Sequence, residues 1–137
     1  MASTTALSDR DYQALARFRH ALRVFQRFSE DAARRAGTTP AQHQLLLAIR
    51  GHRGDRPPVV GDIADALQLR HHSVVELIDR ADAAGLVRRT ADPSDQRRQQ
   101  VRLTDAGREL LEALSKTHRD ELRRFRAEMF DVLRELD

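Results

Sequence analysis

The sequence predicts a mainly α-helical fold with one small β-hairpin. Apolar residues recur at steps of three and four over 9–36 and again from 105 to the end, which is the helical period. The segment 60–87 reads as two short helices separated by a tight break. Two short, partly alternating runs, "LVRRTAD" and "QQVRLT", flank a Pro-containing turn and predict two antiparallel strands.

Length and composition limit the classes of protein that are possible. A chain of 137 residues suits one domain with a modest core, here 1–137. Cysteine is absent, which excludes a disulfide framework, a thiol nucleophile and a cysteine zinc cluster. No apolar run approaches the roughly 20 residues of a membrane helix, and the first residues do not resemble a secretion signal. We therefore expect a cytoplasmic protein with no membrane partner.

The first predicted helix covers 9–36. Ser8 is its expected cap, with Asp11 three residues further on, and Gly37 suits the left-handed position after a helix. Its expected apolar stripe consists of Tyr12, Leu15, Phe18, Leu22, Phe25 and Phe28. Such a long helix needs a partner surface for this stripe.

A second helix is predicted to start at Thr39, with Pro40 in its first turn and Gln42 three residues after the cap. It stops at Gly51, and the Gly- and Pro-rich segment "GHRGDRPPVV" follows as a loop.

The next two short helices form a helix-turn-helix. Ile63, Ala64 and Leu67 give the first its apolar face, and Gly85 ends the second, whose apolar face is Val74, Leu77, Ile78 and Ala81. In such a unit the second helix offers its N-terminal residues to a DNA groove. Those residues are Arg70, His71, His72 and Ser73, with Arg80 further along the polar side.

The hairpin tip is rich in arginine. Arg97 and Arg98 lie beside the groove-reading helix, where a cation can enter the minor groove. Asp95 is expected to hold an arginine in an extended pose. The alternative is a solvated turn with incidental charge, and the preference for 23 Arg over one Lys could be a codon bias. The position directly after a helix-turn-helix favours DNA contact.

The last helix, 105–137, is expected to be capped by Thr104. Its expected stripe is Leu111, Leu114, His118, Leu122, Phe125, Met129, Leu133 and Leu136. One chain of this size can hardly cover both long stripes, which favours a two-fold homodimer through 9–36 and 105–137. Such a dimer places two recognition helices about 34 Å apart, as a palindromic site requires.

The stretch from Val60 to Leu111 resembles the MarR (multiple antibiotic resistance regulator) family of transcription factors. The matching features are the helix-turn-helix, "AGLV" at 84–87, Asp95-Gln96-Arg97, and Leu103-Thr104 with Gly107. The segment "TPAQHQLLLAI" also resembles the family's second helix. The resemblance implies a winged helix-turn-helix lobe at 40–104 and a homodimer on a palindromic double-stranded operator. It also implies a repressor that a small anionic or phenolic compound releases.

The resemblance also assigns roles to residues. Arg97 becomes the wing arginine, Asp95 its supporting acid, and Arg70 and Arg80 candidates for phosphate contacts. Candidate effector-binding residues are Phe18, Leu22, His43, Leu47 and Arg50, although packing is the alternative for the apolar three. The sequence departs from the family pattern in three ways: Gln96 stands in place of an arginine, Ala81 stands in place of a leucine, and the C-terminal region is short.

Other chemistry is weakly supported. No nucleophile triad, glycine-rich phosphate loop or acid pair suggests an enzyme, and no cofactor is expected. The six histidines are scattered, so no metal site is predicted, although His43 and His118 with Glu30 are a conceivable set. The alternatives to a sequence-specific regulator are a non-specific DNA-architectural protein without a ligand and a helical protein-interaction module.

Overall fold

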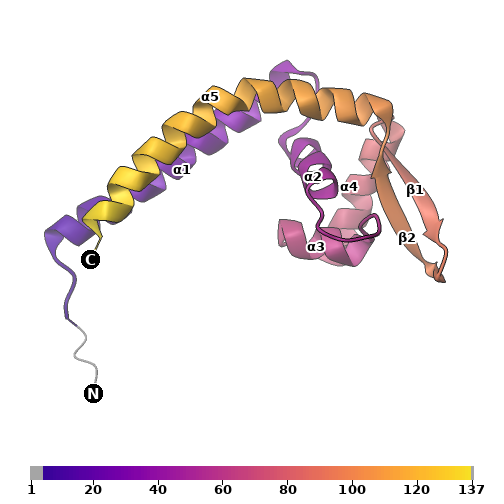
Figure 1. Cartoon of the computed structure of the whole chain (residues 1–137), viewed down its shortest axis with the longest axis horizontal. Helices are drawn as coiled ribbons and strands as arrows, with labels where there is room; N and C mark the ends of the chain where they lie inside the picture. Colours follow the sequence, from indigo (N-terminus) through magenta and orange to yellow (C-terminus); the bar gives the residue numbers. More distant parts are fainter. Residues whose placement is uncertain (1–4, 137) are drawn as a thin grey trace. The chain divides into compact units, whose positions relative to one another are not determined.

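The computed structural model describes residues 5–136, where five helices and one two-stranded sheet follow one another (Figure 1). Residues 1–4 and 137, which the predicted domain includes, lie outside the described residues. The predicted class, mainly helical with one hairpin, is confirmed. In chain order the elements are α1 (Asp9–Arg35), α2 (Pro40–Arg50), α3 (Val60–Leu67), α4 (His71–Ala83), β1 (Val87–Asp92), β2 (Asp95–Leu103) and α5 (Asp105–Glu135).

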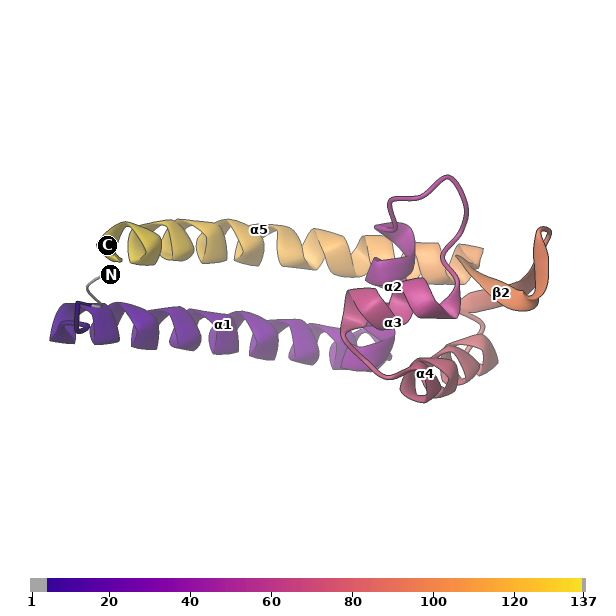
Figure 2. The same cartoon turned by 90° about the horizontal axis from the view of Figure 1, so that it is seen from below.

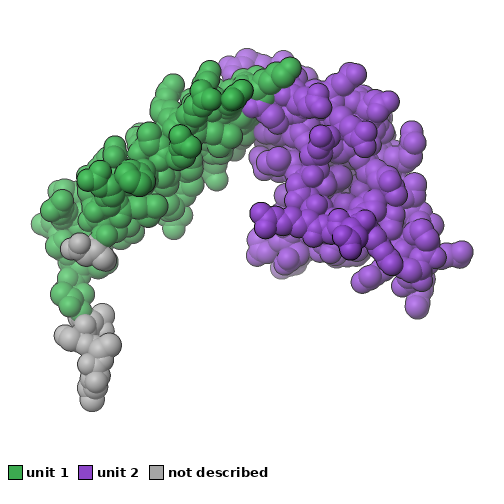
Figure 3. All heavy atoms as spheres, viewed as in Figure 1, with its two compact units in different colours: residues 1–32, 116–137 green, residues 33–115 purple. Residues whose placement is uncertain are grey.

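The chain contains two compact units (Figure 3). One comprises residues 33–115, and the other the described parts of 1–32 and 116–137. Residues 33–115, unit 2 in Figure 3, hold α2, α3, α4 and the hairpin, and unit 1 holds most of α1 and α5. Among the described residues, no helix combines the length and apolar character needed to cross a membrane.

Side-chain caps fix where three helices begin, as the sequence predicts. At α1, the Asp11 backbone N–H donates to Ser8 Oγ, and the Ser8 N–H donates to the Asp11 carboxylate at 2.9 Å. At α2, the Gln42 N–H donates to Thr39 Oγ1 at 3.1 Å. At α5, the Gly107 N–H donates to Thr104 Oγ1 at 3.1 Å. Each cap satisfies an N–H group that has no partner within its helix.

The hydrophobic core of residues 33–115 lies where α2, α3 and α4 pack together with the hairpin (Figure 2). The predicted apolar faces of α3 and α4 supply much of it, so these helices turn their polar sides to solvent. The turn between them is tight, because Gln68 adopts a left-handed conformation with φ +53°. The buried residues are Leu45, Leu46, Ile49, Ile63, Val74, Leu77, Ile78, Ala81, Leu86, Val87, Val101 and Leu111.

The turn after α4 is joined to the start of α5. Gly85 takes φ +76°, which glycine adopts without steric cost. Thr104 Oγ1 donates to the Gly85 carbonyl at 2.6 Å, and the Thr104 N–H donates to the Leu86 carbonyl at 3.1 Å. A Cβ added at Gly107 would lie 2.1 Å from that same Leu86 oxygen. The "AGLV" and "LT…G" motifs therefore meet at one close backbone crossing.

The hairpin pairs β1 with β2 from Val87↔Leu103 to Asp92↔Asp95, with a register shift between Ala91 and Asp92. The loop after α2 runs along the free edge of β2. There the Val101 N–H donates to the Pro58 carbonyl at 2.9 Å, and Val59 forms a bridge with Gln100. The loop thus fastens the base of the hairpin to the helical core.

In unit 1, α1 and α5 lie side by side and antiparallel (Figures 1 and 2). Arg17 Nη1 contacts Glu135 Oε1 at 2.7 Å near one end, and His118 Nε2 contacts Ser29 Oγ at 2.9 Å near the other. Between them the Phe25 and Phe125 rings have centroids 5.0 Å apart. These contacts align two long helices over several turns.

Both predicted stripes are only partly covered within this unit. Tyr12, Leu15, Leu122 and Leu133 are exposed by 41% or more. On α1 the buried positions in this unit carry small side chains, which allow close approach, and these are Ala14, Ala21, Ser29 and Ala32. On α5, Glu121 and Val132 are buried in place of Leu122 and Leu133. In this second half of α5, the face that α1 covers is therefore one residue out of step with the apolar stripe, which stays exposed.

Candidate nucleic-acid interface

The N-terminal end of α4 carries four of the predicted contact residues. Arg70 is the N-cap residue, His71 and His72 are exposed in the first turn, and Ser73 is half-buried. No side chain caps this helix start, so its first N–H groups and the positive end of its dipole are available to an anion. The buried side of α4 anchors the helix and directs this end outward.

The other end of α4 is tied to the hairpin by an arginine that sequence reasoning missed. Arg89 of β1 contacts Asp79 through Nη1 and Asp82 through Nη2, the latter at 3.2 Å. Arg89 therefore neutralises two acids near the predicted contact residue Arg80, which is exposed in the last turn. The acids lie three residues apart on one helix face, and this spacing was the available signal.

The hairpin tip presents the predicted wing arginine. The Arg97 side chain is 94% exposed, and its backbone N–H donates to Asp95 Oδ1 at 3.0 Å. The same oxygen lies 3.5 Å from Arg97 Nε. Arg98, the next residue, is also exposed. Asp95 thus contacts both the backbone and the side chain of Arg97, and the extended pose of the guanidinium stays a prediction.

A second carboxylate, Asp92, organises the turn itself. Asp92 Oδ1 accepts hydrogen bonds from the Ser94 N–H at 2.9 Å and the Ser94 hydroxyl at 2.8 Å. These bonds lower the pKa of Asp92 below its usual 3.8, and the bond from the backbone N–H has the larger effect. Arg56, from the loop after α2, donates to Ser94 Oγ at 2.9 Å. Sequence reasoning missed this connection, because nothing in the spacing of 56 and 94 indicates a contact.

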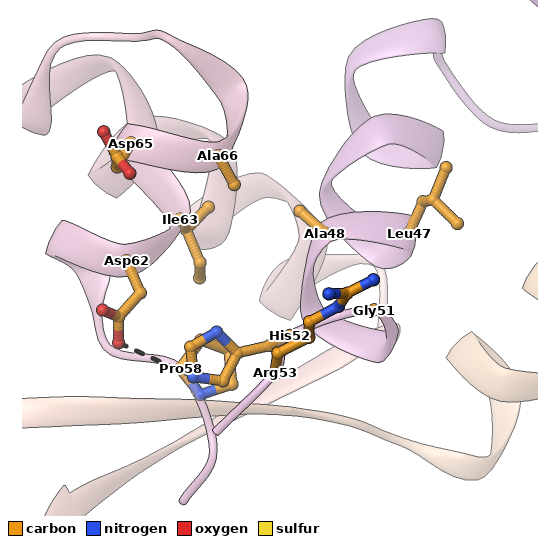
Figure 4. Close-up of a pocket in the computed structure, with 10 residues that line it drawn as sticks. All are labelled: Leu47, Ala48, Gly51, His52, Arg53, Pro58, Asp62, Ile63, Asp65 and Ala66. Carbon is orange, nitrogen blue, oxygen red and sulfur yellow. Dashed lines mark ion pairs between the residues drawn. The ribbon is translucent and has the colours of Figure 1, made fainter.

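The predicted effector residues are not gathered in one described cavity. Phe18 and Leu22 lie half-buried on α1, and His43 is buried on α2. Leu47 lines a cavity of about 340 Å³ between the end of α2 and α3, where His52 Nε2 lies 4.0 Å from Asp62 Oδ2 (Figure 4). Arg50 lines a different cavity. The effector set stays a prediction.

The histidines do not assemble into a ligand set in the part of the chain that is described. Within residues 5–136, no three His, Cys, Asp or Glu side chains are grouped so that they could hold a metal ion. His118 instead lies against aromatic rings, with the Phe28 and His118 centroids 5.4 Å apart, and its Nε2 contacts Ser29. His118 therefore has a packing role between α1 and α5.

This arrangement of helices and hairpin is a winged helix-turn-helix: α3 and α4 form the helix-turn-helix, and β1 and β2 form the wing. The MarR family model matches residues 36–98, which include α2, α3, α4 and most of the wing. Over these residues the chain is similar to the MarR family, and the resemblance seen in the sequence is confirmed.

Solved structures of the family share the fold. AbsC, a MarR family transcriptional regulator from Streptomyces coelicolor, is 26% identical with a TM-score of 0.75, over 89% of this chain and 82% of AbsC. A mutant of S. aureus MepR bound to an oligodeoxyribonucleotide is 25% identical with a TM-score of 0.67, over 85% and 82%. A mutant E. coli MarR complexed with operator DNA is 19% identical with a TM-score of 0.67, over 87% and 79%. Comparison with curated protein sequences gives no match.

Proposed function

We propose that this chain is a dimeric, sequence-specific DNA-binding transcriptional regulator. The observation that carries the proposal is the pairing of an exposed, uncapped start of α4 with an exposed wing arginine that Asp95 holds. The MepR structure with a bound oligodeoxyribonucleotide supports it, since that protein shares the fold at 25% identity. The proposal includes no catalytic activity and a cytoplasmic location, where chromosomal DNA is accessible.

Each part of the surface has a role in the proposal. His71, His72 and Ser73 read base edges in the major groove, while Arg70 and Arg80 contact phosphates. Arg97 enters the adjacent minor groove, with Arg98 beside it and Asp95 as its support. Phosphate contacts set affinity for any sequence, whereas base contacts set the preference among sequences.

Dimerisation is the part of the proposal that concerns α1 and α5. In unit 1, large apolar side chains remain exposed although the two helices pack together. They are Tyr12, Leu15, Val24, Leu122, Phe130 and Leu133. Pairing with a second copy buries such a surface and yields a two-fold axis, which matches the two-fold symmetry of a palindromic operator. Exposed apolar patches of this kind are typical of interaction surfaces.

The regulatory part of the proposal rests on the family resemblance. In it the dimer acts as a repressor, and a small anionic or phenolic ligand releases it from the operator. A ligand can do so only by binding the DNA-free conformation more tightly than the DNA-bound one.

A non-specific DNA-architectural protein is the competing function. The test compares the affinity for a duplex selected by the protein with that for a scrambled duplex of equal length at about 150 mM salt. A regulator binds the selected duplex about 10³-fold or more tightly, whereas an architectural protein binds both alike.

His71→Ala is expected to change which duplexes are preferred, while Arg70→Ala weakens all of them similarly. Parallel losses in both variants would contradict the assigned roles.

A further inference from the structure

The outer face of α4 carries an acid among the residues that are proposed to contact DNA. Glu76 is exposed, and it stands four residues after His72, three after Ser73 and four before Arg80. Residues three and four apart are neighbours on a helix surface, so these side chains share one face. The opposite face of α4 is buried in the core. If His72 and Ser73 lie at base edges in a groove, Glu76 therefore lies in that groove too.

Glu76 differs from the other two acids of α4, because no basic side chain neutralises it. Arg89 of β1 contacts Asp79 and also Asp82, the latter at 3.2 Å. Within residues 5–136, the Glu76 carboxylate forms neither an ion pair nor a side-chain hydrogen bond. Both of its oxygens are therefore available to accept hydrogen bonds from a partner outside the chain.

An unneutralised carboxylate is unfavourable on a surface that approaches phosphates. Duplex DNA carries one negative charge per about 1.7 Å of its axis, so Glu76 lowers the affinity for every sequence by repulsion. Folding gives little reason for the acid, since its side chain is exposed and takes no part in the core. A pair with Arg80, four residues on, would add little to stability at an exposed position.

The major groove offers such a carboxylate one well-matched base. A carboxylate only accepts hydrogen bonds, and the amino donors in that groove are cytosine N4 and adenine N6. Adenine also presents the acceptor N7 beside its amino group, which repels a carboxylate, whereas cytosine presents only the donor. A glutamate in the groove therefore favours cytosine over adenine.

We propose that Glu76 is a specificity-determining residue that accepts a hydrogen bond from N4 of a cytosine in each half-site. The inference rests on the proposed function, and it adds a base contact to it. Glu76 lies about 6 Å beyond His72 along α4, which corresponds to roughly two base-pair steps of about 3.4 Å. The cytosine is therefore expected about two base pairs from the pair that His72 contacts. Arg89 supports this selectivity, because it neutralises Asp79 and Asp82 and leaves Glu76 to meet the base.

The experiment selects binding sites from random duplex DNA at about 150 mM salt with the wild type, Glu76→Ala and Glu76→Gln. Glu76→Gln keeps the size of the side chain and replaces the carboxylate by an amide, which suits adenine N6 and N7. Glu112→Gln makes the same charge change at an exposed position of α5 and is the matched control. Circular dichroism verifies that the variants fold.

Fluorescence anisotropy then compares two duplexes that differ only at the selected base pair, with cytosine or adenine on the strand that is read. The wild type is expected to prefer cytosine by about 5- to 150-fold. This ratio falls at least about fivefold in Glu76→Ala, Glu76→Gln shifts the preference toward adenine, and Glu112→Gln keeps the wild-type ratio. If Glu76 only repels phosphates, both Glu76 variants bind every duplex more tightly with an unchanged ratio, and that result overturns the base contact.

The outcomes separate this inference from the proposed function. A folded wild-type protein that selects no motif refutes the proposed function and the base contact with it. A wild type that selects a motif, together with a Glu76→Ala variant that selects the same motif unchanged, overturns the base contact alone and leaves the regulator.

Discussion

One neighbouring carboxylate, that of Asp95, contacts Arg97. Its side chain is almost fully exposed, and within residues 5–136 its Nε contacts the Asp95 carboxylate while its backbone N–H donates to the same oxygen. A guanidinium held in place loses less entropy on binding than a free one. Removal of the wing arginine is therefore the most direct test of the proposed contact between the hairpin and DNA.

We expect Arg97→Ala to weaken binding to a selected duplex by about 1–3 kcal/mol. Fluorescence anisotropy with labelled duplex measures the change, and circular dichroism verifies the fold. Arg53→Ala, which removes the same charge from the loop after α2, is expected to have a smaller effect. A folded Arg97→Ala protein with wild-type affinity would remove the wing from the interface.

Asp92 gives the tip a dependence on pH. Its pKa is lowered by the Ser94 N–H and hydroxyl, so the ionised form stabilises the fold above the usual value of 3.8. This stabilisation is lost as the pH falls through the lowered pKa of the folded protein. Ser94→Ala removes the hydroxyl and keeps the N–H, which is the larger cause.

The pKa of Asp92 is therefore expected to rise in Ser94→Ala, but not as far as 3.8. A carboxyl titration by NMR measures it, with Asp11 as the internal control, since Ser8 lowers the pKa of Asp11 independently. An unchanged Asp92 titration in Ser94→Ala would show that the hydroxyl has no part in holding the turn.

At the scale of elements, the α4–β1 turn crosses the start of α5 at a close backbone contact. A methyl group at Gly107 cannot fit 2.1 Å from the Leu86 carbonyl without backbone movement. Gly107→Ala is expected to destabilise the protein by about 1–3 kcal/mol, as overpacking does. Gly61→Ala is the matched control: it meets nothing within 4 Å in α3 and is expected to stabilise by about 0.5–1 kcal/mol. Urea unfolding measures both, and equal stability of the two variants would contradict this view of the crossing.

Local signals predicted the element boundaries well. Ser8, Thr39 and Thr104 cap their helices as their sequence contexts indicate, because a cap involves residues three positions apart. The face of α5 was not predictable in the same way. To predict that Glu121 is buried and Leu122 exposed, one must know which side of α5 is covered by α1. Apolar spacing alone predicts that the leucine is buried.

In the candidate site, too, features set by neighbouring residues could be predicted, whereas contacts between different elements could not. The start of α4 and the Asp95–Arg97 pair follow from motifs within a few residues, and the sequence located both. The contacts of Arg56 with Ser94 and of Arg89 with Asp82 bring together different elements. Such groupings depend on the packing of the core and have no counterpart in spacing.

At the scale of the whole molecule, substitution of an exposed apolar side chain of α5 tests the proposed dimerisation. Phe130→Glu places a charge among them and is expected to raise the dimer dissociation constant more than about tenfold while helicity is kept. Asp120→Lys, at a 94% exposed side chain on the polar side of α5, is the charge-changing control. Analytical ultracentrifugation over a range of concentrations distinguishes them, and equal self-association of the two variants would place the dimer contact elsewhere.

The most direct test of the central claim is selection from a pool of random duplex DNA, followed by sequencing, at about 150 mM salt, where non-specific phosphate binding is weak. A dimeric sequence-specific regulator is expected to enrich a palindrome whose half-sites lie about one helical turn, roughly 34 Å, apart. A folded dimer that enriches no motif would contradict the claim and favour an architectural role.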